Sequence, residues 1–479
     1  MSSAVDVSHW QAVVHLASKS NCKTHSKSQT RRGSVLYRIL ATLPSPVQDL
    51  PEVRRSPVTE DEIPLVAVIG VGYVGLHLVT GFSKRYNVIA FDLSQKRLES
   101  VAGELLPNPR LSLTSDPSRL GAATHFLVSV PTLLVPGTSV VDTSYLQSAI
   151  DTIAAHARVG ATVVIESSVA VGMTRSLLAK VALKCHLKAG MSPEVRPLHP
   201  SVYAIHTNYL GILQRVDPGR TIPSLESIPK IISGLDDIAP GSLRSIQKLY
   251  GPVFDNLVPV SSPEVAEMTK LYENCQRMIC IAYTNEMFDA CRALPTPIDG
   301  FEVACAAATK PFGYMPFSPS AGVGGHCIPV NPHYLFSTSD FPLLRHATEN
   351  MATRPTAIVD SVVGKLLEKD NLKASSMMHR PKVLVVGVAF KPGQDVLSHS
   401  PGIQMINHLV SRWQADVTFA DPLVKGEAVP QAPRLHVETE WNRQALSKFD
   451  AIIVVVKQVG LDFGVLEGLE ATLVEWCCA

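Results

Sequence analysis

The sequence predicts an α/β protein with two doubly wound domains joined by a long central helix and preceded by a disordered N-terminal extension. Two parts of the chain, near residues 65 and 382, share one pattern. Each has an apolar, β-branched run that leads into a glycine and then into a helical stretch. A long periodic stretch without internal proline or glycine lies between the two. The length of 479 residues fits roughly three domains. We expect the boundaries at 1–59, 60–258, 259–372 and 373–479.

The totals exclude several classes of protein. The net charge is +1, from 43 basic and 42 acidic residues, which argues against binding of nucleic acid or of an anionic membrane surface. No apolar run approaches the roughly 18 residues that a membrane-spanning helix needs. The nine cysteines are scattered, without a C-x-x-C pair or a His/Cys cluster. We therefore predict no metal site and a reducing, cytoplasmic location.

Residues 1–59 form a separate, basic segment. They contain few acidic residues and no regular apolar period. Segments of this kind rarely bury enough apolar surface to fold, so we expect a disordered extension. A transit peptide has a similar composition and is the alternative interpretation.

The first α/β domain opens with a nucleotide-binding pattern. Leu65–Ile69 (LVAVI) is typical of a buried strand, and the sequence GVGYVG at 70–75 follows it and leads into a helical stretch. In this context Gly70 permits a tight turn, Gly72 lets a pyrophosphate approach the backbone, and Gly75 allows close helix packing. The helix N-terminus then faces the negative charge of the phosphates.

A second strand, Asn87–Phe91, ends at Asp92. A carboxylate at that position accepts hydrogen bonds from ribose hydroxyls and repels a 2′-phosphate. Together with the glycine turn, it predicts a Rossmann-like domain that binds NAD rather than NADP.

Polar residues also follow two further predicted strands of this domain. Thr124–Val130 leads to Thr132, and Thr162–Ile165 leads to Glu166. The carboxyl ends of parallel strands are where an open α/β sheet binds ligands. The alternative is that both are ordinary strand-end capping residues. The predicted cofactor contacts from this domain are Gly70, Gly72, Tyr73, Val74, Gly75, Asp92, Thr132 and Glu166.

The central stretch Pro263–Ala290 predicts a helix of several turns. Glu267, Lys270 and Asn274 are spaced by three and four residues, which places them on one helix face. That face presents an ammonium group and an amide to one small volume. Single lysines and asparagines on helices are usually solvated, which is the alternative. The opposite apolar side, expected to be core or dimer contact, carries Met268, Leu271, Met278 and Ile281.

The loop 322–332 (GVGGHCIPVNP) places Cys327 between a glycine run and two prolines. Glycines allow close approach of a substrate, and prolines fix the exit path of the chain. The loop therefore predicts a thiol held in place. A buried, inert cysteine at an ordinary turn is the alternative.

The last domain repeats the strand-to-glycine pattern. We predict strands at Pro381–Gly387, Ala415–Phe419 and Asp450–Val456, a helix at Gly402–Arg412, and a final strand that is short or missing. The loop after the first strand lacks the GxGxxG order, so we expect no second dinucleotide site here. Lys391 lies on this loop, placed for a phosphate or a sugar.

Seven motifs occur in an order that resembles the UDP-glucose/GDP-mannose dehydrogenase family of nucleotide-sugar 6-dehydrogenases. They are GVGYVG (70–75), VPT (130–132), ESSVAVGMT (166–174), SPEV (192–195), EMTKLYEN (267–274), GVGGHCIPV (322–330) and GVAFKPGQD (387–395). The cysteine loop is similar to that of the UDP-N-acetylhexosamine dehydrogenases. The resemblance implies NAD-dependent, two-step oxidation of UDP-N-acetylglucosamine or UDP-N-acetylmannosamine to the uronate, with UDP-glucose as the alternative substrate. It also implies a homodimer formed through the central domain, and a role in polysaccharide biosynthesis.

The resemblance also assigns roles to single residues. Cys327 adds to the aldehyde and carries a thiohemiacetal and then a thioester, because a thiolate is both a good nucleophile and a good leaving group. Lys270 and Asn274 stabilise the oxyanion. The other roles that the resemblance implies are water attack for Glu194, adenosine contact for Arg97, and substrate binding for Gly324, Gly325 and Lys391.

Several positions depart from the family pattern, among them Asn331, Ser398, Val396, Leu198 and Ser320. Asn331 stands where the family has an aspartate that assists proton handling, and an amide cannot act as a base at neutral pH. Ser398 stands where the family has an arginine that contacts the cofactor. These departures leave one further alternative, a catalytically impaired paralogue that binds NAD or a nucleotide sugar.

Overall fold

The computed structural model describes residues 56–105, 107–135, 138, 140–193, 226–310, 312–371 and 380–478. All of them belong to one compact unit, Glu52–Ala479. Nearly all of the predicted disordered extension, and Glu194, lie outside the described residues. Within the part that is described, no helix combines the length and the apolar composition needed to cross a bilayer.

The first domain is built on an eight-stranded sheet with the order β10-β9-β8-β7-β4-β1-β2-β3, in which only the β8–β9 pair is antiparallel. The predicted strands β1, β2 and β7 have the expected bounds, and β4 is shorter than predicted. The chain leaves β1 toward β2 on one side and later returns to place β4 on the other, so the loops after β1 and β4 meet at a topological switch point. The strands are β1 (Leu65–Ile69), β2 (Asn87–Phe91), β3 (Leu111–Thr114), β4 (His125–Val128), β7 (Thr162–Ile165), β8 (Lys188–Met191), β9 (Lys230–Gly234) and β10 (Leu257–Pro259).

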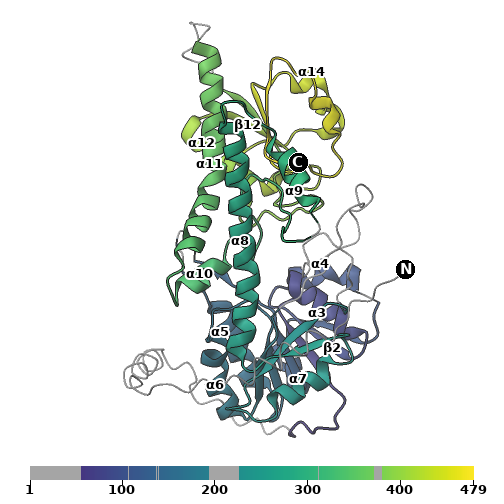
Figure 1. Ribbon diagram of the computed structural model, residues 1–479. Helices are drawn as coiled ribbons and strands as arrows, with labels where there is room; N and C mark the ends of the chain where they lie inside the picture. Colours follow the sequence, from purple (N-terminus) through teal and green to yellow (C-terminus); the bar gives the residue numbers. More distant parts are fainter. Residues whose placement is uncertain are drawn as a thin grey trace, which may run out of the picture. The chain divides into compact units, whose positions relative to one another are not determined.

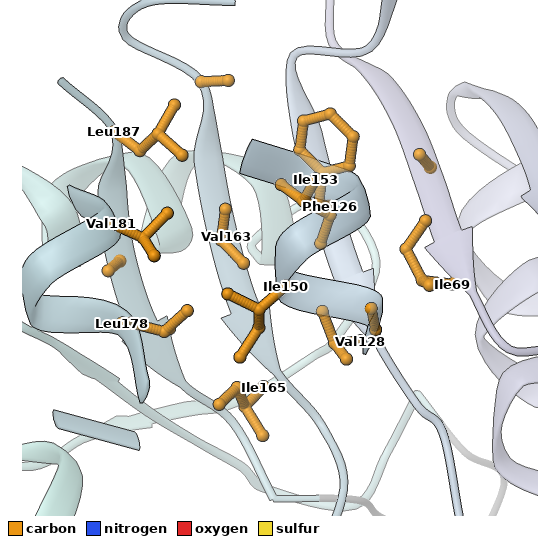
Figure 2. Close-up of a cluster of buried hydrophobic side chains, with 14 of the residues drawn as sticks. Ile69, Phe126, Val128, Ile150, Ile153, Val163, Ile165, Leu178, Val181 and Leu187 are labelled. Carbon is orange, nitrogen blue, oxygen red and sulfur yellow. The ribbon is translucent and has the colours of Figure 1, made fainter. Parts of the chain in front are cut away.

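Helices cover both faces of this sheet, which is why its central strands are apolar along most of their length. On one face, Ile150 of α5 and Leu178 of α6 pack with Phe126 of β4 (Figure 2). On the other face, Phe82 of α3 packs with Tyr250 of α7. The helices of this domain are α3 (Tyr73–Ser83), α4 (Gln95–Leu105), α5 (Ser144–His156), α6 (Met173–Cys185) and α7 (Ser242–Tyr250).

Two long helices form the central part, α8 (Pro263–Ala293) and α11 (Pro342–Asn371), and they pack along each other (Figure 1). The predicted central helix is confirmed and extends three residues further than expected. Arg354 of α11 forms an ion pair with Asp289 of α8. The short helices α9 (Gly300–Ala308) and α10 (Asn331–Phe336) lie between the two in sequence, and α10 directly follows the cysteine loop.

The last domain is a four-stranded, fully parallel sheet with the order β12-β11-β13-β14. The final strand, expected to be short or missing, is present with four residues. The elements are β11 (Lys382–Val386), α12 (Pro401–Trp413), β12 (Asp416–Ala420), β13 (Ala451–Val454) and β14 (Leu473–Trp476). The remaining short elements of the described chain are β5 (Leu133–Leu134), β6 (Val141–Asp142), α13 (Val437–Glu440), α14 (Arg443–Leu446), and 3₁₀ turns at Pro117–Ala122, Gly426–Ala428 and Phe463–Leu466.

Candidate functional site

The glycine turn after β1 has the geometry that a dinucleotide needs. Gly70 has a φ of 89°, which disfavours any residue with a side chain. A Cβ on Gly75 would lie 1.9 Å from the carbonyl oxygen of Gly70, so the helix can pack here only without a side chain. Gly72 differs, because its φ is −69° and a Cβ there would meet nothing within 4 Å. The chain itself does not require a glycine at 72, and the space beside it is open.

Asp92 and Arg97 both hold this turn in place. The Asp92 carboxylate accepts hydrogen bonds from the N–H groups of Val71 (2.8 Å) and Ser94 (2.9 Å). Arg97 Nε donates to the carbonyl oxygen of Val71 (2.8 Å). The two predicted adenosine-side residues are therefore brought to the glycine turn, next to the start of α3 at Tyr73 and Val74.

Glu166 directly follows β7, at the strand end where the sequence places it, but its side chain lies in the core of the domain. Its side chain is fully buried and accepts hydrogen bonds from Lys230 Nζ (2.7 Å) and from the Tyr250 hydroxyl. Lys230 is also buried and donates to the carbonyl oxygen of Pro193 (2.9 Å). Burial, and then the neighbouring carboxylate, raise the pKa of Tyr250 above its usual range. The Glu166 carboxylate therefore belongs to the core of the domain, and a contact with the cofactor would have to come from its backbone.

The predicted polar face of α8 is present. Glu267 is almost fully buried, and its two oxygens accept hydrogen bonds from the N–H groups of Gly172 (2.6 Å) and Thr174 (2.8 Å) at the start of α6. Burial raises the pKa of Glu267 to about 7, although these two donors act in the opposite direction. Lys270 is half-buried one turn later, and Asn274 is buried. Of the opposite side, Leu271 and Met278 are core, Ile281 is partly buried and Met268 is exposed.

The cysteine loop is attached to this face of α8. The carbonyl oxygen of Cys327 accepts hydrogen bonds from the N–H groups of Val330 (3.1 Å) and Asn331 (2.8 Å), which close the turn into α10. The side-chain oxygen of Asn331 accepts a hydrogen bond from Asn274 Nδ2 (2.5 Å). Cys327 is half-buried, unlike Cys275, whose pKa is raised to about 12 by burial. The structure thus holds Cys327 in a turn rather than in an apolar interior.

Other contacts tie the cysteine loop to the loops at both strand ends. Tyr334 of α10 donates its hydroxyl hydrogen toward the carbonyl oxygen of Thr132 (3.5 Å), in the loop after β4. Ala170, which follows β7, lies in one apolar cluster with Leu271, Val323 and Tyr334. These contacts therefore make the cysteine loop a neighbour of the α8 face and of the strand ends of the first domain.

The predicted substrate-binding residues gather around Phe390. A Cβ on Gly324 would lie 2.6 Å from Phe390 Cβ, and one on Gly325 would lie 3.0 Å from Phe390 Cε2. The N–H of Gly325 donates to the carbonyl oxygen of Ser398 (2.8 Å). Lys391 directly follows Phe390 on the loop after β11. These glycines permit close packing between the two loops.

Two residues that sequence reasoning left out of the site are prominent in the structure. Glu267 was placed on the polar face but received no role, although its buried side chain joins α6 to α8. Lys230 is a lone charge within the apolar strand KIISG, which is a signal for a buried partner. In the part of the chain that the structure describes, no group of three or more His, Cys, Asp or Glu side chains could hold a metal ion.

Three family models match successive parts of the chain. They are the NAD binding domain (residues 65–253), the central domain (264–349) and the UDP binding domain (384–469) of the UDP-glucose/GDP-mannose dehydrogenase family. The three matches together cover the cofactor turn, the α8 face with the cysteine loop, and the loop that carries Lys391.

Curated relatives and solved structures agree with these matches. The chain is 29% identical over 379 residues to a UDP-N-acetyl-D-mannosamine dehydrogenase of Pyrococcus horikoshii, covering 75% of this chain and 84% of the relative. It is 27% identical over 414 residues to an NDP-N-acetyl-D-galactosaminuronic acid dehydrogenase of Ralstonia nicotianae, covering 82% and 90%. The solved UDP-D-ManNAc dehydrogenase of Pyrococcus horikoshii has a TM-score of 0.70 at 24% identity, over 86% of this chain and 99% of that one. A UDP-glucose dehydrogenase of Pyrobaculum islandicum has a TM-score of 0.68 at 18% identity, over 88% and 96%, and shares the fold.

Proposed function

The chain belongs to the UDP-glucose/GDP-mannose dehydrogenase family as an NAD-dependent dehydrogenase of UDP-sugars, and on this premise we propose that its substrate is a UDP-N-acetylhexosamine. The proposal is supported by the cysteine loop GHCIP and by relatives whose names specify N-acetylmannosamine, N-acetylgalactosaminuronic acid and N-acetylglucosamine. UDP-N-acetylglucosamine and UDP-N-acetylmannosamine are the two preferred candidates, and UDP-glucose is the alternative. A cytoplasmic location and a role in polysaccharide biosynthesis remain predictions.

The proposed chemistry oxidises the primary alcohol of the sugar in two steps. NAD accepts a hydride in each step, so two molecules are reduced per uronate. The Cys327 thiolate adds to the aldehyde carbon, the second hydride leaves that carbon as a thioester forms, and water displaces the thiolate. Lys270 donates to the oxygen that becomes negative when the thiolate adds. Asn274 has two N–H groups, and its bond to Asn331 uses one of them.

The observation that carries the proposed thiol chemistry is the hydrogen bond between the side chains of Asn274 and Asn331. Because Asn331 also donates its backbone N–H to the carbonyl oxygen of Cys327, the thiol-bearing turn is fixed to the helix face that presents Lys270. A nucleophile and an oxyanion donor that must act on the same carbonyl have to be held in this way. Lys391, on the loop that packs against Gly325, is proposed to bind the phosphates of the nucleotide.

A panel of nucleotide sugars tests the proposal. NADH production is measured with UDP-N-acetylglucosamine, UDP-N-acetylmannosamine and UDP-glucose, and we expect two NADH per uronate with an acetamido sugar. Cys327→Ser should form no uronate while NAD affinity is retained, and Cys275→Ser, at a buried cysteine of α8, is the matched control. Turnover of UDP-glucose alone would reassign the substrate, and an active Cys327→Ser variant would remove the thiol mechanism.

We also propose that two copies of the chain pair through α8. The helix carries an outward-facing stripe of apolar side chains at helical spacing, and Tyr272 and Tyr283 are 71% and 59% exposed. A second copy is the proposed occupant because a 31-residue helix can meet its own equivalent along a matching stripe. Light scattering should give twice the chain mass, and Tyr272→Glu should shift it toward the monomer. The stripe comprises the exposed Val265, Met268, Tyr272, Tyr283 and Met287, together with Ile279, which is partly buried against the core.

A further inference from the structure

The polar face of α8 is fixed at two points, with Lys270 between them. On one side of Lys270, Glu267 accepts hydrogen bonds from the N–H groups of Gly172 and Thr174. On the other side, Asn274 donates to Asn331 of the turn that carries Cys327. Glu267 and Asn274 are seven residues apart, which corresponds to about 10 Å along a helix. One rigid helix segment therefore joins the start of α6, in the NAD-binding domain, to the cysteine turn.

We propose that Glu267 is a positioning residue for the oxidation, which holds the start of α6 against α8 and so fixes Lys270 and Asn274 relative to the NAD-binding domain. This inference rests on the proposed function, because it assumes that Lys270 acts at the reacting carbon. Glu267 itself touches neither substrate nor cofactor in this role. It acts through the helix that carries Lys270.

The chemistry of the contact explains why a glutamate is present. The first N–H groups of a helix have no partner within the helix, and two N–H groups at the start of α6 point to the two oxygens of one carboxylate. Above about pH 7 the Glu267 side chain is mainly a carboxylate, which only accepts hydrogen bonds, so it satisfies both donors. A glutamine would direct an NH₂ group at one of them. An aspartate is shorter by one methylene and cannot keep both bonds without a shift of the helices.

A second contact joins the same two helices and provides a control. Arg175 of α6 pairs with Glu264 of α8 (2.6 Å) and with Asp237 (2.6 Å). These groups are partly exposed, and an exposed ion pair contributes little to holding two elements together. Glu264→Gln makes the same chemical change as Glu267→Gln, one turn away on the same helix.

The test measures the rate of the first NADH formed in a single turnover at 25 °C, together with the affinities for NAD and UDP. For Glu267→Gln we expect a rate lower by roughly 10- to 100-fold, the size of effect that a displacement of about 1 Å produces. We expect affinities within twofold of the wild type, and Glu264→Gln should keep the wild-type rate. Hydrogen exchange of the segment 170–176 should increase in Glu267→Gln while the segment 65–91 stays protected.

Several outcomes would overturn the inference. A purely structural role predicts a lower unfolding temperature with an unchanged rate at 25 °C, and a rate within twofold of the wild type would establish that role. If Glu267→Gln does not fold, the same rate is measured for Glu267→Asp, and a rate within twofold of the wild type again overturns the inference. The variant Lys270→Met distinguishes a failure of this inference from a failure of the proposed function. Loss of the rate in Lys270→Met with a normal rate in the Glu267 variants removes only this inference, whereas a normal rate in Lys270→Met removes the proposed function beneath it.

Discussion

Gly72 allows the cofactor turn to be tested without disturbing the fold. In the structure, a Cβ at this position meets nothing within 4 Å, and the φ of −69° suits any residue. Gly72→Ala should therefore fold. Gly72 is also the N-cap of α3, where alanine is less favourable than glycine, while alanine loses less backbone entropy on folding. The free energy of unfolding should change by no more than about 1 kcal/mol.

The same methyl group should strongly weaken NAD binding. It occupies the open space beside residue 72, through which we propose that the pyrophosphate approaches the backbone N–H groups at the start of α3. Loss of one hydrogen bond to a charged group costs about 1.5–3 kcal/mol, which corresponds to roughly 10- to 150-fold weaker binding. NADH affinity is measured by fluorescence titration, and stability by urea unfolding of the same samples.

Two other glycines provide the controls. Gly103 of α4 is exposed and also has nothing within 4 Å of its Cβ position. Gly103→Ala should keep the wild-type affinity and gain roughly 0.5–1 kcal/mol of stability. Gly75→Ala should fail to fold normally, because its Cβ would overlap the carbonyl oxygen of Gly70. If Gly72→Ala binds NADH as tightly as Gly103→Ala does, the open space beside residue 72 is not where the phosphates lie.

Three further predictions follow from buried groups. Lys230→Met should lower the free energy of unfolding by about 3–5 kcal/mol, because it leaves the Glu166 carboxylate buried without its cation; a urea-unfolding loss below 1 kcal/mol would contradict this. Asn331→Asp should speed thioester hydrolysis, measured as uronate released after the second NADH, and an unchanged rate would show that residue 331 does not limit that step. Glu267 has a folded pKa raised from 4.5 to about 7, so its contribution to stability is fully present below pH 4.5 and is lost as pH rises to about 7. The loss amounts to about 3 kcal/mol, and the difference between wild-type and Glu267→Gln unfolding curves should show this slope.

Sequence patterns were sufficient for strands and helices whose signal is local. β1, β2 and β7 match their predicted ranges because a parallel strand buried on both faces is a continuous apolar run. β9 was not predicted, because its first residue, Lys230, looks solvated until its partner Glu166, 64 residues away, is known. No helix was predicted over the range of α11, and the sequence there contains Pro355, a residue that normally ends a helix.

In the site, too, some features follow from short stretches of sequence, and others depend on contacts between residues far apart in the chain. The glycine turn and the spacing of Lys270 and Asn274 are local patterns, and the structure contains both as predicted. The roles of Glu166 and Glu267 depend instead on which groups face them after folding. Both are glutamates in apolar surroundings, but one meets an ammonium group within its own domain and the other meets two N–H groups of a different helix. Only the second of these contacts joins two elements of the proposed site.

The pair of amides at Asn274 and Asn331 shows what the departure from the family pattern changes physically. Both side chains are at least 95% buried, so a carboxylate at 331 would place a charge where water cannot solvate it. Burial would raise the pKa of that carboxylate toward neutrality, which is the property that a general base requires. The asparagine keeps the hydrogen bond to Asn274 without a buried charge. Asn331→Asp should therefore gain hydrolysis and lose stability together, and a variant that gained both would contradict this account of the position.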